Sequence, residues 1–372
     1  MSQLSVPSKR LQSLDTLRGF DMFFIMGGDV LFRSLGRLFP DTFWATIGTQ
    51  MYHKAWNGFA FEDLIFPLFL FIAGISFPFS LAKQRERGKS EADIRRKILS
   101  RGLKLVLLGC IYNGLLQFDF EHQRYASVLA RIGLAWMFAA LLATRLQSKG
   151  RMAVVAVLLL GYWALLAGVP APDAAGAGVF TMEGSLVGYV DRLLLPGVLH
   201  GGIHDPEGLL STLPAVASAL LGIQAGEFVR WRKEGLSESR KAVYMALAGV
   251  VLIGLAQLWN PFFPINKNLW TSSFVCQAAG WSLLLFSLFY YVIDVREWRR
   301  GSFFFMVIGL NSITIYLAQE FIDFWKTSGA LFGGVVSLFP ESVHGVVASL
   351  AYIATCWGFL YFLYRQRIFL KV

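Results

Sequence analysis

A long apolar run over residues 59–82 is the feature that most limits what this chain can fold into. A transmembrane helix needs about 20 mainly apolar residues, and this run has that length. Similar stretches recur along the chain, which is only 16% charged, whereas soluble domains have about 25% charged residues. The sequence therefore predicts an all-α polytopic membrane protein with one transmembrane domain over residues 1–372.

Ten transmembrane helices in one bundle account for these stretches. The predicted spans cover residues 19–35, 59–82, 98–117, 125–146, 152–169, 208–229, 243–260, 271–294, 303–324 and 343–364. Most lysines and arginines lie in alternate connections, such as 83–97 and 230–241. Because cytoplasmic loops are enriched in Lys and Arg, we expect both termini in the cytoplasm and the loop at about 170–207 on the opposite side.

The net charge of +10 has the same source, because the cations sit in short loops beside the spans. No basic domain or nucleic-acid-binding motif accompanies them, so we do not expect nucleic acid as a partner. The sequence also has no zinc-ligand pair, phosphate-binding loop or nucleophile elbow, and no metal is expected.

A histidine at the non-cytoplasmic mouth of the 59–82 span is the first candidate for chemistry. His53 precedes this span, and Asp29 lies near the outer end of the first span. If the two spans form a hairpin, the carboxylate fixes the imidazole tautomer and favours its charged form. We therefore predict His53 and Asp29 as catalytic groups. The alternative is that each is satisfied separately at the headgroup level.

Polar residues close to this point, or facing the same side, are candidates for substrate binding. On a helix Glu62 and Asp63 point in different directions, so we expect at most one to face His53. Polar residues of the ninth span must face protein or a wet cavity, whereas a polar segment with a Trp also suits an interfacial anchor. The predicted substrate-binding residues are Trp56, Asn57, Asp63, Asn266, Lys267, Asn268, Trp270, Asn311 and Glu320.

Two arginines are candidates for holding an anionic donor. Arg131 lies part-way into the fourth span, where it either pairs with a carboxylate or meets an anionic ligand. Arg18 lies at the cytoplasmic end of the first span, where Asp21 is expected to pair with it.

Six stretches resemble, in the same order, the heparan-α-glucosaminide N-acetyltransferase family and its bacterial members. They are SLDTLRGFDMFF (13–24), HKAWNGFAFEDLIFPLFLFIAGIS (53–76), LARIGLAW (129–136), HDPEGLLSTLPAVASALLGIQAG (204–226), NKNLWTSSF (266–274) and GLNSITIYLAQE (309–320).

The resemblance implies transfer of acetyl from cytosolic acetyl-CoA to the amine of glucosamine, or of a glucosamine-terminated glycan, on the opposite side of the membrane. It places the essential histidine of the H-x-x-W-N-G motif at His53, and it puts Asp29 where the family has an asparagine. It also implies a multi-pass protein of a bacterial inner membrane, and a homodimer is expected from its size.

Two other functions remain open at this stage. One is a proton-coupled transporter of amino sugars or N-acetylglucosamine that uses His53 and Asp29. The other is an O-acyltransferase acting on an envelope polysaccharide. Direct transfer and an acetyl-histidine intermediate are equally compatible with the sequence.

Overall fold

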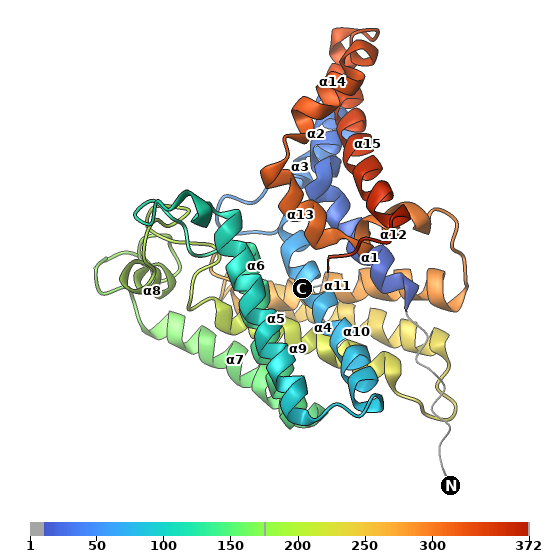
Figure 1. Ribbon diagram of the computed structural model, residues 1–372. Coiled ribbons are helices and arrows are strands. Elements are labelled where there is room, and N and C mark those ends of the chain that lie inside the picture. The colour runs from blue at the N-terminus through green and yellow to red at the C-terminus, as the bar shows by residue number, and fades with distance from the viewer. Residues whose placement is uncertain (1–10, 175, 371–372) are drawn as a thin grey trace.

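Helices make up nearly all of the computed structural model, which describes residues 11–174 and 176–370 (Figure 1). In chain order they are α1 (Gln12–Phe23), η1 (Phe24–Gly28), α2 (Asp29–Leu38), α3 (Phe43–Gln50), α4 (Glu62–Glu86), α5 (Glu91–Tyr112), η2 (Leu115–Gln117), α6 (Val128–Arg145), α7 (Ser148–Gly168), α8 (Leu186–Leu194), α9 (Thr212–Arg230), α10 (Glu238–Trp259), α11 (Ser272–Phe289), η3 (Tyr290–Val295), α12 (Ser302–Leu310), α13 (Ser312–Phe321), α14 (Phe324–Val336), η4 (Glu341–Val343) and α15 (His344–Arg365). The described residues contain no β-strand, which confirms the all-α class.

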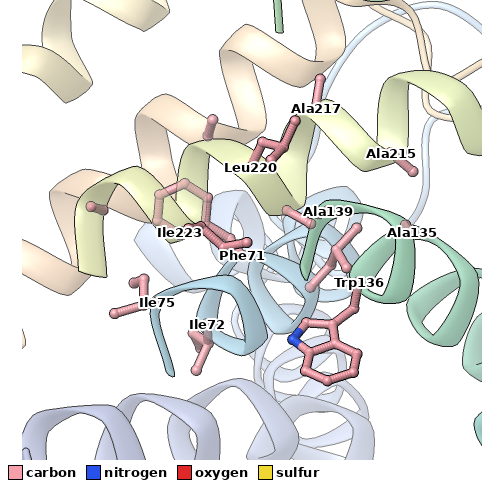
Figure 2. Packing of buried hydrophobic residues seen from close by; sticks show 14 of the residues in the cluster. Phe71, Ile72, Ile75, Ala135, Trp136, Ala139, Ala215, Ala217, Leu220 and Ile223 are labelled. Carbon is pink, nitrogen blue, oxygen red and sulfur yellow. The ribbon is translucent and has the colours of Figure 1, made fainter. Parts of the chain in front are cut away.

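The core forms where α4 packs against α6 and α9 (Figure 2). Phe71 and Ile75 of α4 and Leu220 of α9 are almost completely buried. Small residues let the two backbones approach, as is common between membrane helices. A Cβ atom on Gly222 of α9 would collide with the backbone carbonyl of Phe71. This contact fixes α4, whose N-terminal end carries the predicted site.

Seven helical segments are long and apolar enough to cross a membrane: α4, α6, α7, α9, α10, α11 with η3, and η4 with α15. The pair α12 and α13, bent by 68°, makes an eighth if it counts as one span. These numbers refer to the two described stretches of the chain. They support an integral membrane protein but do not confirm the predicted ten spans.

The first and third of the ten predicted spans are the two that are absent from these seven or eight segments. The first is divided into α1, η1 and α2, because Met26 and Gly27 leave helical geometry and Gly27 has φ of 105°. The third corresponds to α5, which starts at Glu91 and has a strongly charged first half. Both segments are helical, but neither meets the length and hydropathy criteria for a span.

The predicted ninth span is broken at Asn311, between α12 and α13. The Asn311 amide donates a hydrogen bond to the Ile368 carbonyl and accepts one from the Thr314 hydroxyl. The break therefore redirects α13, so that Ile313 and Tyr316 reach the cavity described below.

The predicted loop at about 170–207, between α7 and α9, contains the helix α8 (Figure 1). Ser185 begins this helix, and its hydroxyl accepts a hydrogen bond from the Gly188 amide. Residues between 182 and 207 of the connection contribute to the cavity wall.

Candidate active site

A cavity of about 580 Å³ is lined by residues of several helices and of the loops that precede them. Met22 of α1, Phe69 of α4 and Ile132 of α6 line its apolar inner part. Its mouth is polar and is built from the loops that precede α4, α6, α9 and α11. An apolar pocket with a few convergent polar groups is the usual form of a small-molecule site.

His53 and Asp63 form the best-defined polar pair of the cavity. The His53 Nδ1 atom lies 2.9 Å from the Asp63 Oδ1 atom. Asp63 is buried in the first turn of α4, and its other oxygen accepts hydrogen bonds from the amides of Lys54 and Ala60. These contacts fix the Asp63 carboxylate, which accepts a hydrogen bond from Nδ1–H of the imidazole.

Lys267 reaches His53 from the loop before α11. Its Nζ atom lies 3.1 Å from Nδ1 and 3.2 Å from Nε2 of the imidazole, and 3.8 Å from Asp63 Oδ1. Burial lowers the pKa of Lys267. Its ammonium charge is therefore lost at a lower pH than that of an ordinary lysine.

Pairing between two loops places Lys267 beside His53. Asn57 and Asn266 form an isolated antiparallel bridge. The Asn266 amide group also donates a hydrogen bond to the Asn57 side-chain oxygen at 3.0 Å. The Gly58 amide donates to the Ile265 carbonyl at 2.8 Å. Asn57 and Asn266 thus hold the site together, whereas Lys267 and its neighbour Asn268 line the cavity.

Asp29 is not the carboxylate that contacts His53. It forms an ion pair with Arg33, one turn further along α2. The predicted hairpin was wrong in its geometry, because α2 continues from Asp29 to Leu38 and α3 follows it. Ten helical residues rise by about 15 Å, so the chain runs well past Asp29 before it returns. Asp63, at the start of α4, makes the contact with His53 that the sequence predicted for Asp29.

Glu62 and Asp63 both face the cavity, in contrast to the prediction that at most one faces the site. Both lie in the first turn of α4. Asp63 contacts His53, whereas the Oε2 atom of Glu62 is buried without a hydrogen-bond partner.

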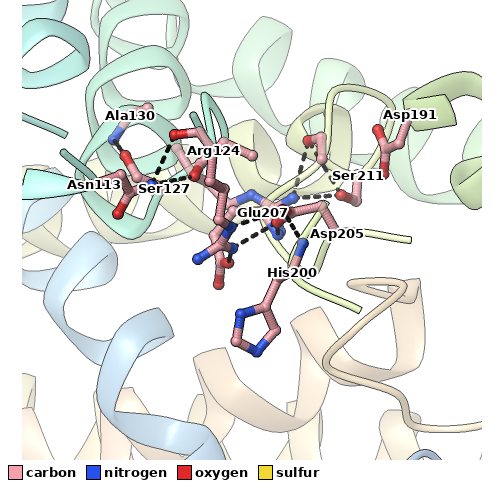
Figure 3. Close-up of polar contacts among 12 residues, drawn as sticks. Asn113, Arg124, Ser127, Ala130, Asp191, His200, Asp205, Glu207 and Ser211 are labelled. Carbon is pink, nitrogen blue, oxygen red and sulfur yellow. Dashed lines mark hydrogen bonds and ion pairs between the residues drawn. The ribbon is translucent and has the colours of Figure 1, made fainter. Parts of the chain in front are cut away.

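A second polar cluster, which the sequence did not predict, also contributes to the cavity lining (Figure 3). Arg124 precedes α6 and donates hydrogen bonds of 2.8 and 2.6 Å to the two oxygens of Asp205, and it also pairs with Glu207. The His200 backbone amide donates to Asp205, while its ring points away from the cluster in Figure 3. In the sequence, the dense H-x-x-x-H-D-x-E pattern over residues 200–207 is the feature that could have indicated this cluster.

Arg124 also sets the charge of this cluster. Burial alone would raise the pKa of Asp205, but the hydrogen bonds and positive charge of Arg124 lower it. Burial lowers the pKa of the nearby His204. The mouth therefore combines fixed carboxylates with a histidine that tends to be neutral.

Trp56 lies at the rim. Its indole nitrogen donates a hydrogen bond to the Phe180 carbonyl at 2.8 Å, and its ring meets His204 edge to face. Trp56 and Asn57 line a separate surface depression together with residues 178–183.

Several predicted substrate residues lie outside the described cavity lining. Trp270 is 1% exposed and packs on Phe66 and Phe274 in the core. Asn311 supports the break between α12 and α13, and Glu320 is exposed near the end of α13. The aromatic ring of Trp270 thus serves core packing, and the side-chain amide of Asn311 serves the helix break.

The two predicted donor-binding arginines occupy different settings. Arg131 is buried, donates hydrogen bonds to the Gly208 carbonyl and the Ser211 hydroxyl, and lies over the Trp270 ring. Arg18 pairs with Asp15 and donates a hydrogen bond to Ser76. Within residues 11–174 and 176–370, no three His, Cys, Asp or Glu side chains are grouped as ligands for a metal ion.

A family model described as heparan-alpha-glucosaminide N-acetyltransferase, catalytic, matches residues 10–260. The heparan-alpha-glucosaminide N-acetyltransferase of Homo sapiens is 26% identical over 422 residues, which cover 100% of this chain. That of Mus musculus is 25% identical over 417 residues, which cover 98% of it. The chain spans 61% of the length of each of these relatives. The chain belongs to the family of the heparan-alpha-glucosaminide N-acetyltransferase catalytic region.

Proposed function

We propose that this protein is a membrane-embedded acetyltransferase that moves acetyl from acetyl-CoA to the amine of glucosamine or a glucosamine-terminated glycan. The observation that carries the proposal is the contact between His53 and the buried Asp63 in an open cavity, with Lys267 beside the ring. The family and the names of its two relatives support the same reaction class.

His53 acts as the base in this reaction. Asp63 accepts a hydrogen bond from Nδ1–H, which keeps the proton on Nδ1, so the Nε2 lone pair is available for a proton from the attacking amine. When the acceptor binds, its amine replaces Lys267 at Nε2. The imidazolium then returns the proton to the departing thiolate of coenzyme A.

Lys267 stabilises the negative charge that develops on the thioester oxygen. Its Nζ atom lies within hydrogen-bond distance of the imidazole. The thioester carbonyl attacked by an amine held at Nε2 therefore lies within reach of the Lys267 ammonium group. A donor aimed at such an oxyanion contributes a large part of the catalysis in acyl-transfer enzymes.

The two substrates occupy different parts of the cavity. The apolar inner part, lined by Met22 and Phe69, suits the thioester arm of the donor. The polar mouth, with Asn268 and the Arg124 cluster, suits a sugar. The nucleotide of acetyl-CoA lies towards the cytoplasmic side, where Arg18 is one candidate contact.

Incubation of the purified protein with labelled acetyl-CoA and glucosamine tests the proposal. We expect N-acetylglucosamine and free thiol in equal amounts. Uptake of glucosamine into proteoliposomes without acetylation would favour a transporter, and transfer to glycan hydroxyls but not to amines would favour an O-acyltransferase. A rapid burst of thiol without acceptor would indicate acetyl-His53, and no burst would indicate direct transfer.

A further inference from the structure

Two buried carboxyl groups beside the His53 site have no part in the mechanism described so far. Glu62 lines the cavity, and its Oε2 atom is buried without a hydrogen-bond partner. Asp21 of α1 is 1% exposed, and its Oδ2 atom is likewise unpartnered. The negative charges of the two groups repel each other.

The neighbouring cations already have carboxylates of their own. His53, Lys267 and Arg33 attract Glu62, while Asp63 and Asp21 repel it. However, His53 and Lys267 contact Asp63, and Arg33 pairs with Asp29. The Glu62 carboxylate thus faces the cavity with an oxygen available for a ligand. Ionisable groups in such a position inside a membrane protein are functional by default.

The proton balance of amine acetylation requires a second acceptor. An amino sugar is an ammonium ion until it loses one proton, and only the neutral amine has a lone pair to attack a thioester. The amine loses a second proton when the amide forms. His53 passes that second proton to the thiolate, so the first proton needs another group.

We propose that Glu62 binds the ammonium group of the acceptor and removes its first proton. This inference rests on the proposed function and makes Glu62 a determinant of specificity for amines. The Glu62 carboxylate, whose Oε2 atom has no hydrogen-bond partner in the protein, supplies the negative charge that attracts the ammonium.

The steps balance. An N–H bond of the ammonium breaks and an O–H bond forms on Glu62. The amine lone pair then forms the C–N bond, His53 takes the second proton, and the C–S bond breaks. The thiolate takes the proton from His53, and Glu62 releases its proton through the mouth of the cavity. The net products are the amide, free coenzyme A and one proton.

Binding and pH profiles of Glu62→Gln test the proposal, with Glu121→Gln as a matched control in an exposed outer loop. Wild type and Glu121→Gln should bind glucosamine roughly 10- to 100-fold more tightly than glucose, as expected for a charged hydrogen bond. Glu62→Gln should lose that preference. Its kcat/KM for glucosamine should fall at neutral pH and recover as rising pH deprotonates the amine, and Glu62→Asp should restore part of the activity.

A Glu62→Gln protein that keeps the preference for glucosamine and the wild-type pH profile overturns the inference. If the wild type prefers glucosamine over glucose but does not acetylate it, the proposed function fails while the ammonium site stands.

Discussion

The Nδ1 atom of His53 lies 2.9 Å from the Oδ1 atom of Asp63, although the two side chains differ greatly in exposure. The His53 side chain is 54% exposed and that of Asp63 is 1% exposed. A fixed, buried carboxylate thus orients an imidazole that faces the open cavity. This combination gives a base with one defined tautomer and free access to substrate.

Replacing Asp63 by Asn should leave His53 in place but remove the charge that fixes its tautomer. We expect kcat to fall roughly 100- to 10,000-fold, as in other His–Asp pairs. Steady-state assays of Asp63→Asn should be compared with those of Asp119→Asn, because Asp119 pairs with the exposed His122. Equal activities of the two variants would contradict the role of Asp63.

Lys267 should give the reaction an upper pH limit. Burial lowers its pKa, so the charge that stabilises the oxyanion is lost as pH rises through that lowered value. Lys267→Met should reduce kcat roughly 100- to 1000-fold. Lys267→Arg should be less impaired, and its activity should persist to higher pH than that of the wild type. If the activity of Lys267→Arg falls at the same high pH as that of the wild type, loss of the Lys267 charge is not the cause of the upper pH limit.

The ion pair between Arg124 and Asp205 should stabilise the mouth in a pH-dependent way. The pKa of Asp205 is lowered in the folded protein, so its contribution is present above the unfolded pKa and is lost as pH falls through the folded pKa. Asp205→Asn should lower the free energy of unfolding by about 2 kcal/mol at neutral pH.

Thermal unfolding at several pH values measures this effect, with Asp173→Asn as a control, since Asp173 pairs with Arg192 at a more exposed site. The difference between wild type and Asp205→Asn should shrink in acid. A difference that is constant with pH would show that the lost charge is not its cause.

Close packing of α4 and α9 should tolerate no side chain at Gly222. A Cβ atom there collides with the Phe71 carbonyl, and overpacking of this kind costs about 1–3 kcal/mol. Gly222→Ala should therefore lower the thermal unfolding midpoint. Gly254→Ala on α10 is the matched control, because a Cβ atom there meets nothing within 4 Å. A midpoint equally unchanged in both variants would contradict this account of the core.

The structure brings together three predicted site residues that adjoin an obvious span. His53, Asp63 and Lys267 lie near the starts of the apolar runs that became α4 and α11, and all three line one cavity. The pairing of His53 did not follow, because the local hydrophobic pattern shows neither the break at Met26 and Gly27 nor the helix α3 between α2 and His53.

Contacts between distant loops were also beyond sequence analysis. Arg124 meets Asp205 across 81 residues, and Asn57 meets Asn266 across 209 residues. Trp270 has the character of an interfacial anchor, yet it is buried against Phe66. Its place depends on how α4 and α11 pack, which no periodicity within one segment reveals.

The rate of coenzyme A release with glucosamine in His53→Ala, compared with His122→Ala, tests the central claim most directly. Both residues are histidines that contact an aspartate, but only His53 lines the cavity. We predict that His53→Ala folds with a normal unfolding midpoint and loses activity, while His122→Ala retains wild-type turnover. Wild-type turnover in His53→Ala would contradict the account.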